Sequence, residues 1–322
     1  MANKSVTARR DRYAVCIDAS RRVRWETDRD VIRGRSVDLS RKFLPEGLAM
    51  TERFASLDAD ERRFVSQIQG RTYANMFGLV ERFIGAKMLD VTRTHWLGNQ
   101  DALEALVRFT DEELKHQALF RRLETMMDAC MPAGYTFLPE PNAVAGMVLG
   151  KSTWSVLALT CMIELMTQAH YRQSIEPDAS LSELWQDVFL FHWREEAQHA
   201  VLDEIEWQRE DERLDIAARE RAVDDLIALV SAVDGMLKLQ AGSDARYFAQ
   251  ACSRAVFAEE RTRLEAGFHA AYRWQYIVSG AQEPRFQQVL GGMISGPQSV
   301  RIGAALSPIV DSVAAPALRR AA

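Results

Sequence analysis

Two short segments of the sequence carry the same pair of residue types at the same spacing. Glu113 and His116 lie in DEELKHQ, and Glu196 and His199 lie in REEAQHA. On a helix, residues three apart share a face, so each glutamate can reach the same ion as its histidine. Carboxylate oxygens and imidazole nitrogens are common ligands of divalent transition metals. Each segment therefore predicts half of a metal site.

Each of these segments has a further glutamate upstream, and the spacing is the same in both halves. The interval from Glu81 to Glu113 equals the interval from Glu164 to Glu196. Both upstream glutamates lie among apolar side chains, in GLVERFIG and VLALTCMIELMTQ. A lone carboxylate in an apolar interior is costly unless it is paired or binds a metal. Four carboxylates and two imidazoles therefore predict a site for two metal ions.

A third histidine lies on the same predicted helix as the second segment. His192 comes one helical turn before Glu196 and two turns before His199, so the three side chains project from one helix face. At the equivalent position of the first half, the chain has Phe109. The two ions would therefore be bound unequally. The alternative is that His192 is an interior histidine hydrogen-bonded to a neighbour.

Four long helices must bring these residues together. Each is expected to start at a polar residue able to cap a helix and to continue with apolar residues at intervals of three and four. The expected ranges are 58–91, 101–130, 142–174 and 180–213, with starts at Asp58, Asp101, Asn142 and Ser180. The segment MPAGYTFLPEPN predicts a crossover loop between the second and third helices. This order predicts two antiparallel hairpins with Glu81 and Glu113 at the same level, since each lies roughly 15–18 Å from its turn.

The whole chain is predicted to be all-α. We expect a single domain over residues 1–322, with a core bundle at 58–213 and further helices near 216–240, 244–278 and 283–294. Residues 1–57 are expected to form short helices and an extended arm, and residues 298–322 a loose tail. Two long hairpins joined by a crossover predict the connectivity of a ferritin-like four-helix bundle with additional N- and C-terminal helices.

Composition excludes several classes of partner. A net charge of -5 predicts no nucleic-acid binding. Charged residues interrupt the most apolar stretches, which predicts no membrane span. The basic N-terminus has no apolar core of a signal peptide, and the four cysteines form no closely spaced pair. These features predict a cytoplasmic protein with free thiols.

Residues 81–199 resemble the ferritin-like di-iron carboxylate superfamily in the order and spacing of these motifs. The resemblance implies an enzyme with two Fe ions, with Mn as an alternative, that activates O₂ and oxidises a small organic substrate using electrons from a donor protein. The extra His192 resembles the p-aminobenzoate N-oxygenase family, which implies N-oxygenation of an amine and a seventh ligand. The implied metal ligands are Glu81, Glu113, His116, Glu164, His192, Glu196 and His199.

Further residues near the motifs have two interpretations each. Thr167, on the turn after Glu164, resembles a threonine that di-iron oxygenases keep near the metals, and it is the candidate catalytic residue; its alternative is a hydrogen bond to its own helix. Gly78 and Gly85 predict either a cavity or a close helix contact. The acidic residues beside the motifs could orient the histidines, although most are expected at the surface; they are Asp111, Glu112, Glu195 and Asp203.

Other functions remain open at this point. A ferroxidase or iron-handling protein would use the same ligands, but the predicted helices after residue 216 exceed what such a chain needs. A non-enzymatic helical scaffold with structural metals is a second alternative. In a ribonucleotide reductase small subunit, a radical tyrosine would lie one turn after His116, where this chain has Phe120. The partners expected are therefore O₂, a small molecule, an electron donor and, as for many bundles of this size, a second copy in a homodimer.

Overall fold

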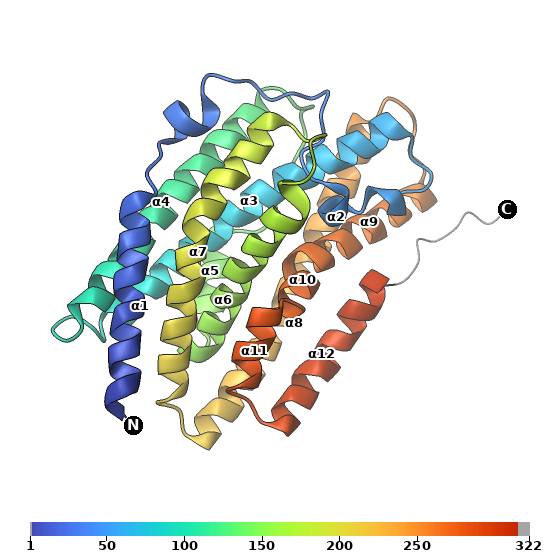
Figure 1. The fold of residues 1–322 in the computed structure, drawn as a ribbon. Coiled ribbons are helices and arrows are strands. Elements are labelled where there is room, and N and C mark those ends of the chain that lie inside the picture. Colours follow the sequence, from blue (N-terminus) through green and yellow to red (C-terminus); the bar gives the residue numbers. More distant parts are fainter. Residues whose placement is uncertain (1, 315–322) are drawn as a thin grey trace.

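Helices form nearly all of the regular structure of this protein. The computed structural model describes residues 2–314, and these residues contain no β-strand (Figure 1). The predicted all-α class is confirmed. Among the same residues, no helix has both the length and the apolar character needed to cross a membrane.

Four long helices position the candidate site. They are α3 (Ala59–Thr92), α4 (Gln100–Asp128), α6 (Thr153–His170) and α7 (Glu183–Asp211). Helix α3 packs along α4, and α6 packs along α7, while α4 contacts α7 and α3 contacts α6. The predicted crossover is confirmed, since residues 129–140 connect α4 to the next helix without helical structure.

The start of α3 agrees with the sequence prediction. The Asp58 side chain accepts a hydrogen bond from the Glu61 N–H, and the Glu61 carboxylate accepts one from the Asp58 N–H. This reciprocal cap satisfies two backbone donors that the first turn of a helix leaves free. It fixes the start of the helix that carries Glu81.

The N-terminal region covers one side of the bundle. Helix α1 (Ala2–Arg22) packs against α4 and α7. The short elements η1 (Thr27–Ile32), α2 (Glu46–Ala49) and η2 (Thr51–Arg53) follow. The expectation of only short helices before residue 57 is wrong, because residues 2–22 form one long helix. Its buried face includes Tyr13, Cys16 and Ile17, and this burial against two neighbouring helices stabilises the long helix.

The C-terminal region covers the opposite side of the bundle (Figure 1). It consists of α8 (Ile216–Ala251), α9 (Ala258–Arg273), η4 (Trp274–Val278), α10 (Ser279–Ala281), α11 (Pro284–Gly291) and α12 (Gly296–Ala314). Helix α8 contacts both α6 and α3, and α9 and α12 pack onto α8. The pair α3 and α6 is therefore enclosed between α4 and α7 on one side and the C-terminal helices on the other.

The third predicted helix is divided in two. Residues Pro141–Leu149 form α5, and α6 starts only at Thr153. Glu140 caps α5 with its side chain, and the Ser152 N–H between the two helices donates to Asp225 on α8. This tertiary hydrogen bond compensates the backbone group that the break leaves free. After α6, the π-helical turn η3 (Tyr171–Ile175) continues the chain.

Two predicted helix caps are also wrong. Helix α4 is capped by Asn99, whose side chain accepts a hydrogen bond from Ala102 N, and Asp101 lies inside the first turn. Helix α7 begins after Ser182 rather than Ser180. The Ser180 hydroxyl instead donates to Asp178 in the preceding turn. Several polar residues precede both helices, so the presence of a polar residue alone does not identify the residue at which each helix starts.

The predicted C-terminal boundaries need two corrections. Helix α8 continues through residues 240–244, and Gly242 lies against α9, since a Cβ added there would lie 3.5 Å from the carboxylate of Glu265. Residues 296–314 form α12 instead of a loose tail, and the buried Ile309 and Val313 hold it against the neighbouring helices. The rest of the predicted tail, 315–322, lies outside the described residues.

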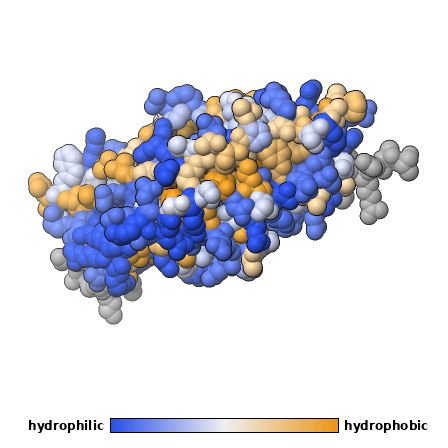
Figure 2. Space-filling model, turned by 90° about the horizontal axis from the view of Figure 1, so that it is seen from above, coloured by the Kyte–Doolittle hydropathy of each residue, from blue (hydrophilic) through white to orange (hydrophobic). Residues whose placement is uncertain are grey.

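The surface and the thiols complete the description. Viewed from above, hydrophobic side chains gather over the central part of one face and hydrophilic side chains surround them (Figure 2). The four cysteines are free: Cys16 and Cys161 are buried, Cys252 is partly buried and Cys130 is exposed. The fold therefore uses no disulfide bond, as expected from the cysteine spacing.

Candidate metal centre

The seven predicted ligands all lie in the interior of the four-helix core. Glu81 comes from α3, Glu113 and His116 from α4, Glu164 from α6, and His192, Glu196 and His199 from α7. None is more than 2% exposed. The predicted register is confirmed, since Oε2 of Glu81 lies 3.5 Å from Nδ1 of His116 on the neighbouring helix.

One group of ligand atoms gathers around His192. Its Nε2 lies 3.0 Å from Oε1 of Glu81 and 2.7 Å from Oε1 of Glu196. Nδ1 of His116 lies 3.1 Å from the same oxygen of Glu196. One atom from each of Glu81, His116, His192 and Glu196 lies within 4.8 Å of the others, which is close enough to hold a metal ion.

A second group adjoins the first. It consists of Glu113, His116, Glu196 and His199, with the same spacing of ligand atoms. Nδ1 of His199 lies 3.1 Å from Oε1 of Glu113 and 3.1 Å from Oε2 of Glu196. Glu196 therefore presents one oxygen to each group. A carboxylate in this position can bridge two ions.

Several polar atoms of the cluster are buried without a normal hydrogen bond. Within the described part of the chain, these atoms are Oε2 of Glu81, both carboxylate oxygens of Glu113, Oε1 of Glu196, and Nδ1 of His116 and His192. Buried polar atoms are rarely left unsatisfied, because each costs free energy. Cations between these facing atoms would satisfy most of them. The residues present therefore fit a metal centre.

Glu164 lies beside the cluster but belongs to neither group. Burial raises the pKa of Glu164 well above its usual value, and the charge of Glu196 and a hydrogen bond with Glu196 add to the shift. Without a cation, Glu164 therefore holds a proton and shares it with Glu196. Its place as a metal ligand stays a prediction.

Two of the cluster histidines, His116 and His199, are charged when no cation is present. Burial lowers the pKa of His199, but the charge of Glu196 and the hydrogen bond with Glu112 outweigh burial and raise it to about 10. Burial also lowers the pKa of His116, yet Glu196 and Glu195 raise it well above its usual value. A metal ion must therefore displace protons from these rings in order to bind.

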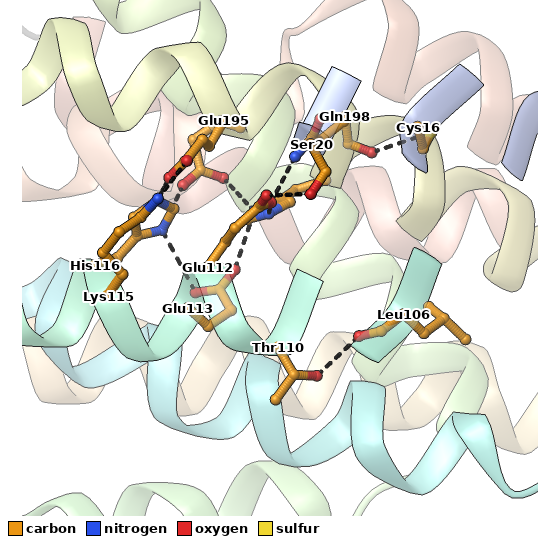
Figure 3. Close-up of polar contacts among 12 residues, drawn as sticks. Cys16, Ser20, Leu106, Thr110, Glu112, Glu113, Lys115, His116, Glu195 and Gln198 are labelled. Carbon is orange, nitrogen blue, oxygen red and sulfur yellow. Dashed lines mark hydrogen bonds and ion pairs between the residues drawn. The ribbon is translucent and has the colours of Figure 1, made fainter. Parts of the chain in front are cut away.

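Two outer glutamates fix the orientation of the rings. Nε2 of His116 lies 2.9 Å from Oε2 of Glu195, and Nε2 of His199 lies 2.9 Å from Oε2 of Glu112. Figure 3 shows Glu195 next to the ring of His116. A carboxylate on Nε2 holds a proton there and leaves Nδ1 facing the site.

The outer glutamates have their own partners. Glu195 accepts a hydrogen bond from Lys115, and Glu112 accepts one from Gln198. The Ser20 hydroxyl of α1 also donates to Glu112 at 2.6 Å (Figure 3). Lys115 and Gln198 occupy equivalent positions of the two motifs, so the outer contacts repeat with the motif. Helix α1 therefore holds Glu112, the glutamate that orients the ring of His199, in place.

The sequence prediction underestimated these two residues. Glu112 is 5% exposed and Glu195 is fully buried, whereas Asp111 is exposed as expected. The available signal was the doubled glutamate, because Glu-Glu-x-x-His occurs in both motifs. Asp203 is also buried and accepts a hydrogen bond from Thr160 at 2.9 Å.

Thr167 does not point its hydroxyl group at the cluster. Its Oγ1 donates to the backbone oxygen of Ile163 at 2.8 Å, which matches the alternative interpretation. A catalytic role for Thr167 stays an untested prediction. Gly85 lies in van der Waals distance of α4, since a Cβ added there would lie 3.7 Å from Cβ of Glu113. This is an ordinary distance, so the close helix contact lies at Gly78 instead, where a Cβ would lie 3.3 Å from Cβ of Phe120.

No family model matches the chain, and no curated protein matches it significantly. The functional conclusion therefore depends on the arrangement of the residues themselves.

Proposed function

We propose that this chain is a ferritin-like di-iron carboxylate oxidoreductase that uses O₂ to oxidise a small organic molecule. The convergence of two Glu-x-x-His segments from α4 and α7 on one buried cluster carries the proposal. Glu81 on α3 and Glu164 on α6 supply the remaining carboxylates. One glutamate on each of two helices and Glu-x-x-His on the other two is the ligand pattern of ferritin-like di-iron and di-manganese proteins.

Charge balance supports two divalent ions. Four carboxylates offset the four positive charges of two such ions, so the buried centre would be neutral with neutral imidazoles. Mostly oxygen ligands with few imidazoles suit iron or manganese better than zinc, whose structural sites favour thiolates and four ligands. We propose iron, with manganese as the alternative that metal analysis decides.

His192 supports the narrower resemblance to the p-aminobenzoate N-oxygenase family. Its Nε2 faces Glu81 and Oε1 of Glu196, and His192 belongs to the first group only, so it would add a ligand to one ion. An extra imidazole on one ion is what that resemblance implies. N-oxygenation of an amine is therefore the most specific form of the proposal.

The chain's own residues would support this chemistry in three ways. The seven ligands would hold the ions, and bound iron would supply the electrons that reduce O₂, replenished by a donor protein. Glu112 and Glu195 keep a proton on Nε2 of each imidazole. The rings of Phe109 and Phe77 exclude water, since they lie with centroids 3.8 Å from that of His199 and 5.2 Å from that of His192.

The first test is metal analysis of protein purified from iron-supplemented cells. We expect about two iron ions per chain, as in other two-metal sites. Protein loaded with Fe(II) without oxygen should then consume O₂ when an oxygen pulse is added. A transient absorption band that decays faster in the presence of an arylamine would support the N-oxygenase form.

Matched variants make the test specific. Glu113→Gln removes one charge from the cluster and should lower both iron content and O₂ consumption. His269→Gln is the control, because His269 pairs with Asp234 away from the cluster. No bound iron in the wild-type protein would overturn the proposal. Iron uptake far beyond two ions per chain would indicate an iron-handling protein, and bound iron that consumes no O₂ would indicate a structural role.

A further inference from the structure

An apolar cavity lies between α3 and α6, beneath α5 and α8. Its inner wall includes the buried Leu79 of α3 and Leu159 of α6. At its rim are the half-buried Met147 of α5 and Val233 and Met236 of α8. The cavity therefore opens towards the surface between α5 and α8 and ends inside the bundle.

The inner end of the cavity adjoins the metal cluster. Phe77 lines the cavity, and its ring also contacts that of His192 with centroids 5.2 Å apart. Glu81 lies one turn after Phe77 on α3, and Glu164 directly follows the cavity residue Ile163 on α6. Helix α3, which carries Glu81, and helix α6, which carries Glu164, thus also form the walls of the cavity.

One polar group stands out among the apolar lining residues. Tyr276 lines the cavity, is 6% exposed, and its hydroxyl has no hydrogen-bond partner among the described residues. It lies on the π-helical turn η4, and such turns are frequent at functional sites. Burial raises the pKa of Tyr276 well above its usual value, so the group is an O–H donor at neutral pH.

The size and lining of the cavity restrict its ligand. No charged residue lines it, so a charged molecule would lose its hydration without compensation. The open volume is only about 40 Å³. Four lining residues are methionines, however, and their flexible side chains can move aside for a ligand of about one aromatic ring; they are Met76, Met147, Met166 and Met236.

We propose that this cavity binds a small, uncharged, mostly apolar molecule with one hydrogen-bond acceptor, and that the Tyr276 hydroxyl donates to that acceptor. If this molecule is also the substrate that the metal centre oxidises, that role rests on the proposed function. The binding itself does not, because it needs neither O₂ nor turnover. The buried hydroxyl gains the partner that it lacks in the protein alone.

Two probes of equal shape test the proposal. Acetophenone carries a carbonyl oxygen, and α-methylstyrene has a CH₂ group in its place. Their affinities are measured by titration calorimetry under argon, with full-length protein and the metal it retains on purification. In Tyr276→Phe, the affinity of acetophenone relative to α-methylstyrene should fall about five- to tenfold, the value of one hydrogen bond to a buried group. Binding of α-methylstyrene should stay within about twofold of wild type, since Tyr276→Phe keeps the ring.

Two further variants serve as controls. Tyr272→Phe removes a buried hydroxyl that already donates to Asp244, so the ratio of the two affinities should not change. Val233→Phe fills the rim at a half-buried position and should weaken both probes at least roughly tenfold through overlap with the ligand. Melting temperature and metal content of each variant show that the fold is kept.

The outcomes separate this proposal from the proposed function. An unchanged affinity ratio in Tyr276→Phe, full binding in Val233→Phe, or no binding of either probe to the wild-type protein would overturn it. The absence of iron would overturn the proposed function and leave the probe result standing. A normal iron content with failed probe binding would do the reverse.

Discussion

The histidines of the cluster are oriented by glutamates from the opposite hairpin. Glu195 of α7 bonds His116 of α4, and Glu112 of α4 bonds His199 of α7. Because Nε2 of each ring is held by a glutamate of the other hairpin, the direction of Nδ1 depends on how the two hairpins pack. The glutamate that holds each ring is thus as important to the geometry of the site as the ligands themselves.

Replacement of one of these two glutamates should weaken the binding of one ion more than that of the other. Glu112→Gln is expected to lower the affinity of the ion held by Glu113 and His199 by about 10- to 100-fold. The ion near Glu81 and His192 should be affected much less, because its ligands do not contact Glu112. Anaerobic titration of metal-free protein with Fe(II) measures both affinities.

The neighbouring acidic residue provides the control for that titration. Asp111 is exposed and next to Glu112 in sequence, so Asp111→Asn makes the same change of charge at the surface. It should leave both affinities unchanged. An equal loss of affinity for the two ions in Glu112→Gln would show that Glu112 does not act through His199.

At this scale, the sequence predicted the cluster better than its surroundings. The spacing along the sequence alone predicted that Glu81, Glu113 and His116 lie at the same depth in the bundle, because the period of a helix and the length of a hairpin fix that register. It could not show that Glu112 and Glu195 are buried. The doubled glutamate of each motif is a local signal, but the burial itself depends on contacts among α1, α4 and α7, which are distant in the sequence.

Among the elements, His170 connects the end of α6 to two other helices. Its Nδ1 accepts a hydrogen bond from the Tyr73 hydroxyl of α3 at 2.7 Å, and its Nε2 lies 2.8 Å from Ser279 Oγ of α10. Burial lowers the pKa of His170 to about 3. The ring is therefore neutral in the folded protein throughout the physiological range.

This neutral ring should make stability depend on pH. In the unfolded chain, the pKa of a histidine is about 6.5, so protonation below that pH favours unfolding. The contribution of His170 is fully present above about pH 6.5 and is lost as pH falls towards 3. Between pH 7 and pH 5, the free energy of unfolding of the wild type should fall by about 2 kcal/mol more than that of His170→Gln.

Urea unfolding of both proteins at the two pH values measures this difference. Comparison of the two proteins cancels the titration of groups that they share, including the cluster histidines. Equal losses in both proteins would mean that His170 becomes protonated without unfolding.

Two glycines of α3 should respond oppositely to alanine. At Gly85 a Cβ would make ordinary contacts, so Gly85→Ala should stabilise the protein by roughly 0.5–1 kcal/mol through helix propensity. At Gly70 a Cβ would lie 2.5 Å from Cβ of Phe43, and Gly70→Ala should destabilise by about 1–3 kcal/mol. Urea midpoints measure both effects, and a loss of stability in Gly85→Ala would contradict the predicted sign.

Among the elements, the long helices could be predicted but several of their ends could not. Apolar periodicity and the Asp58 cap identified α3, since both are local properties of the sequence. The break before Ser152 depends on Asp225, which lies 73 residues further along the chain. The continuity of α8 and the formation of α12 likewise depend on packing between distant segments. Helix propensity is too weak to predict such boundaries alone.

For the whole molecule, the bound ions should be part of what holds the helices together. Ligands from α3, α4 and α7 bring carboxylates and imidazoles into one interior, where Glu164 of α6 adds a further carboxylate. Removal of the metal with a chelator should lower the melting temperature by roughly 10 °C, as expected for tightly bound ions that bind only the folded state. Scanning calorimetry of the loaded and stripped protein measures this.

A charge-neutral variant separates metal binding from other effects of the chelator. Glu113→Gln removes a carboxylate whose two oxygens both lack a normal hydrogen bond. The stripped variant should melt lower than the stripped wild type, because His199 is charged without a cation and loses the carboxylate that faces it at 3.1 Å. Metal should then raise its melting temperature less. A full increase on loading would show that Glu113 does not bind the ions.

The crossed contacts between the two motifs also bear on how the protein is made. On the ribosome, α3 and α4 emerge before α6 and α7, so His116 is synthesised 79 residues before Glu195, which orients its ring. The early hairpin therefore exposes acidic ligands that no partner orients. Under the proposed function, iron would be captured in its final geometry only after α7 has left the exit tunnel, and its insertion would follow synthesis of the second hairpin.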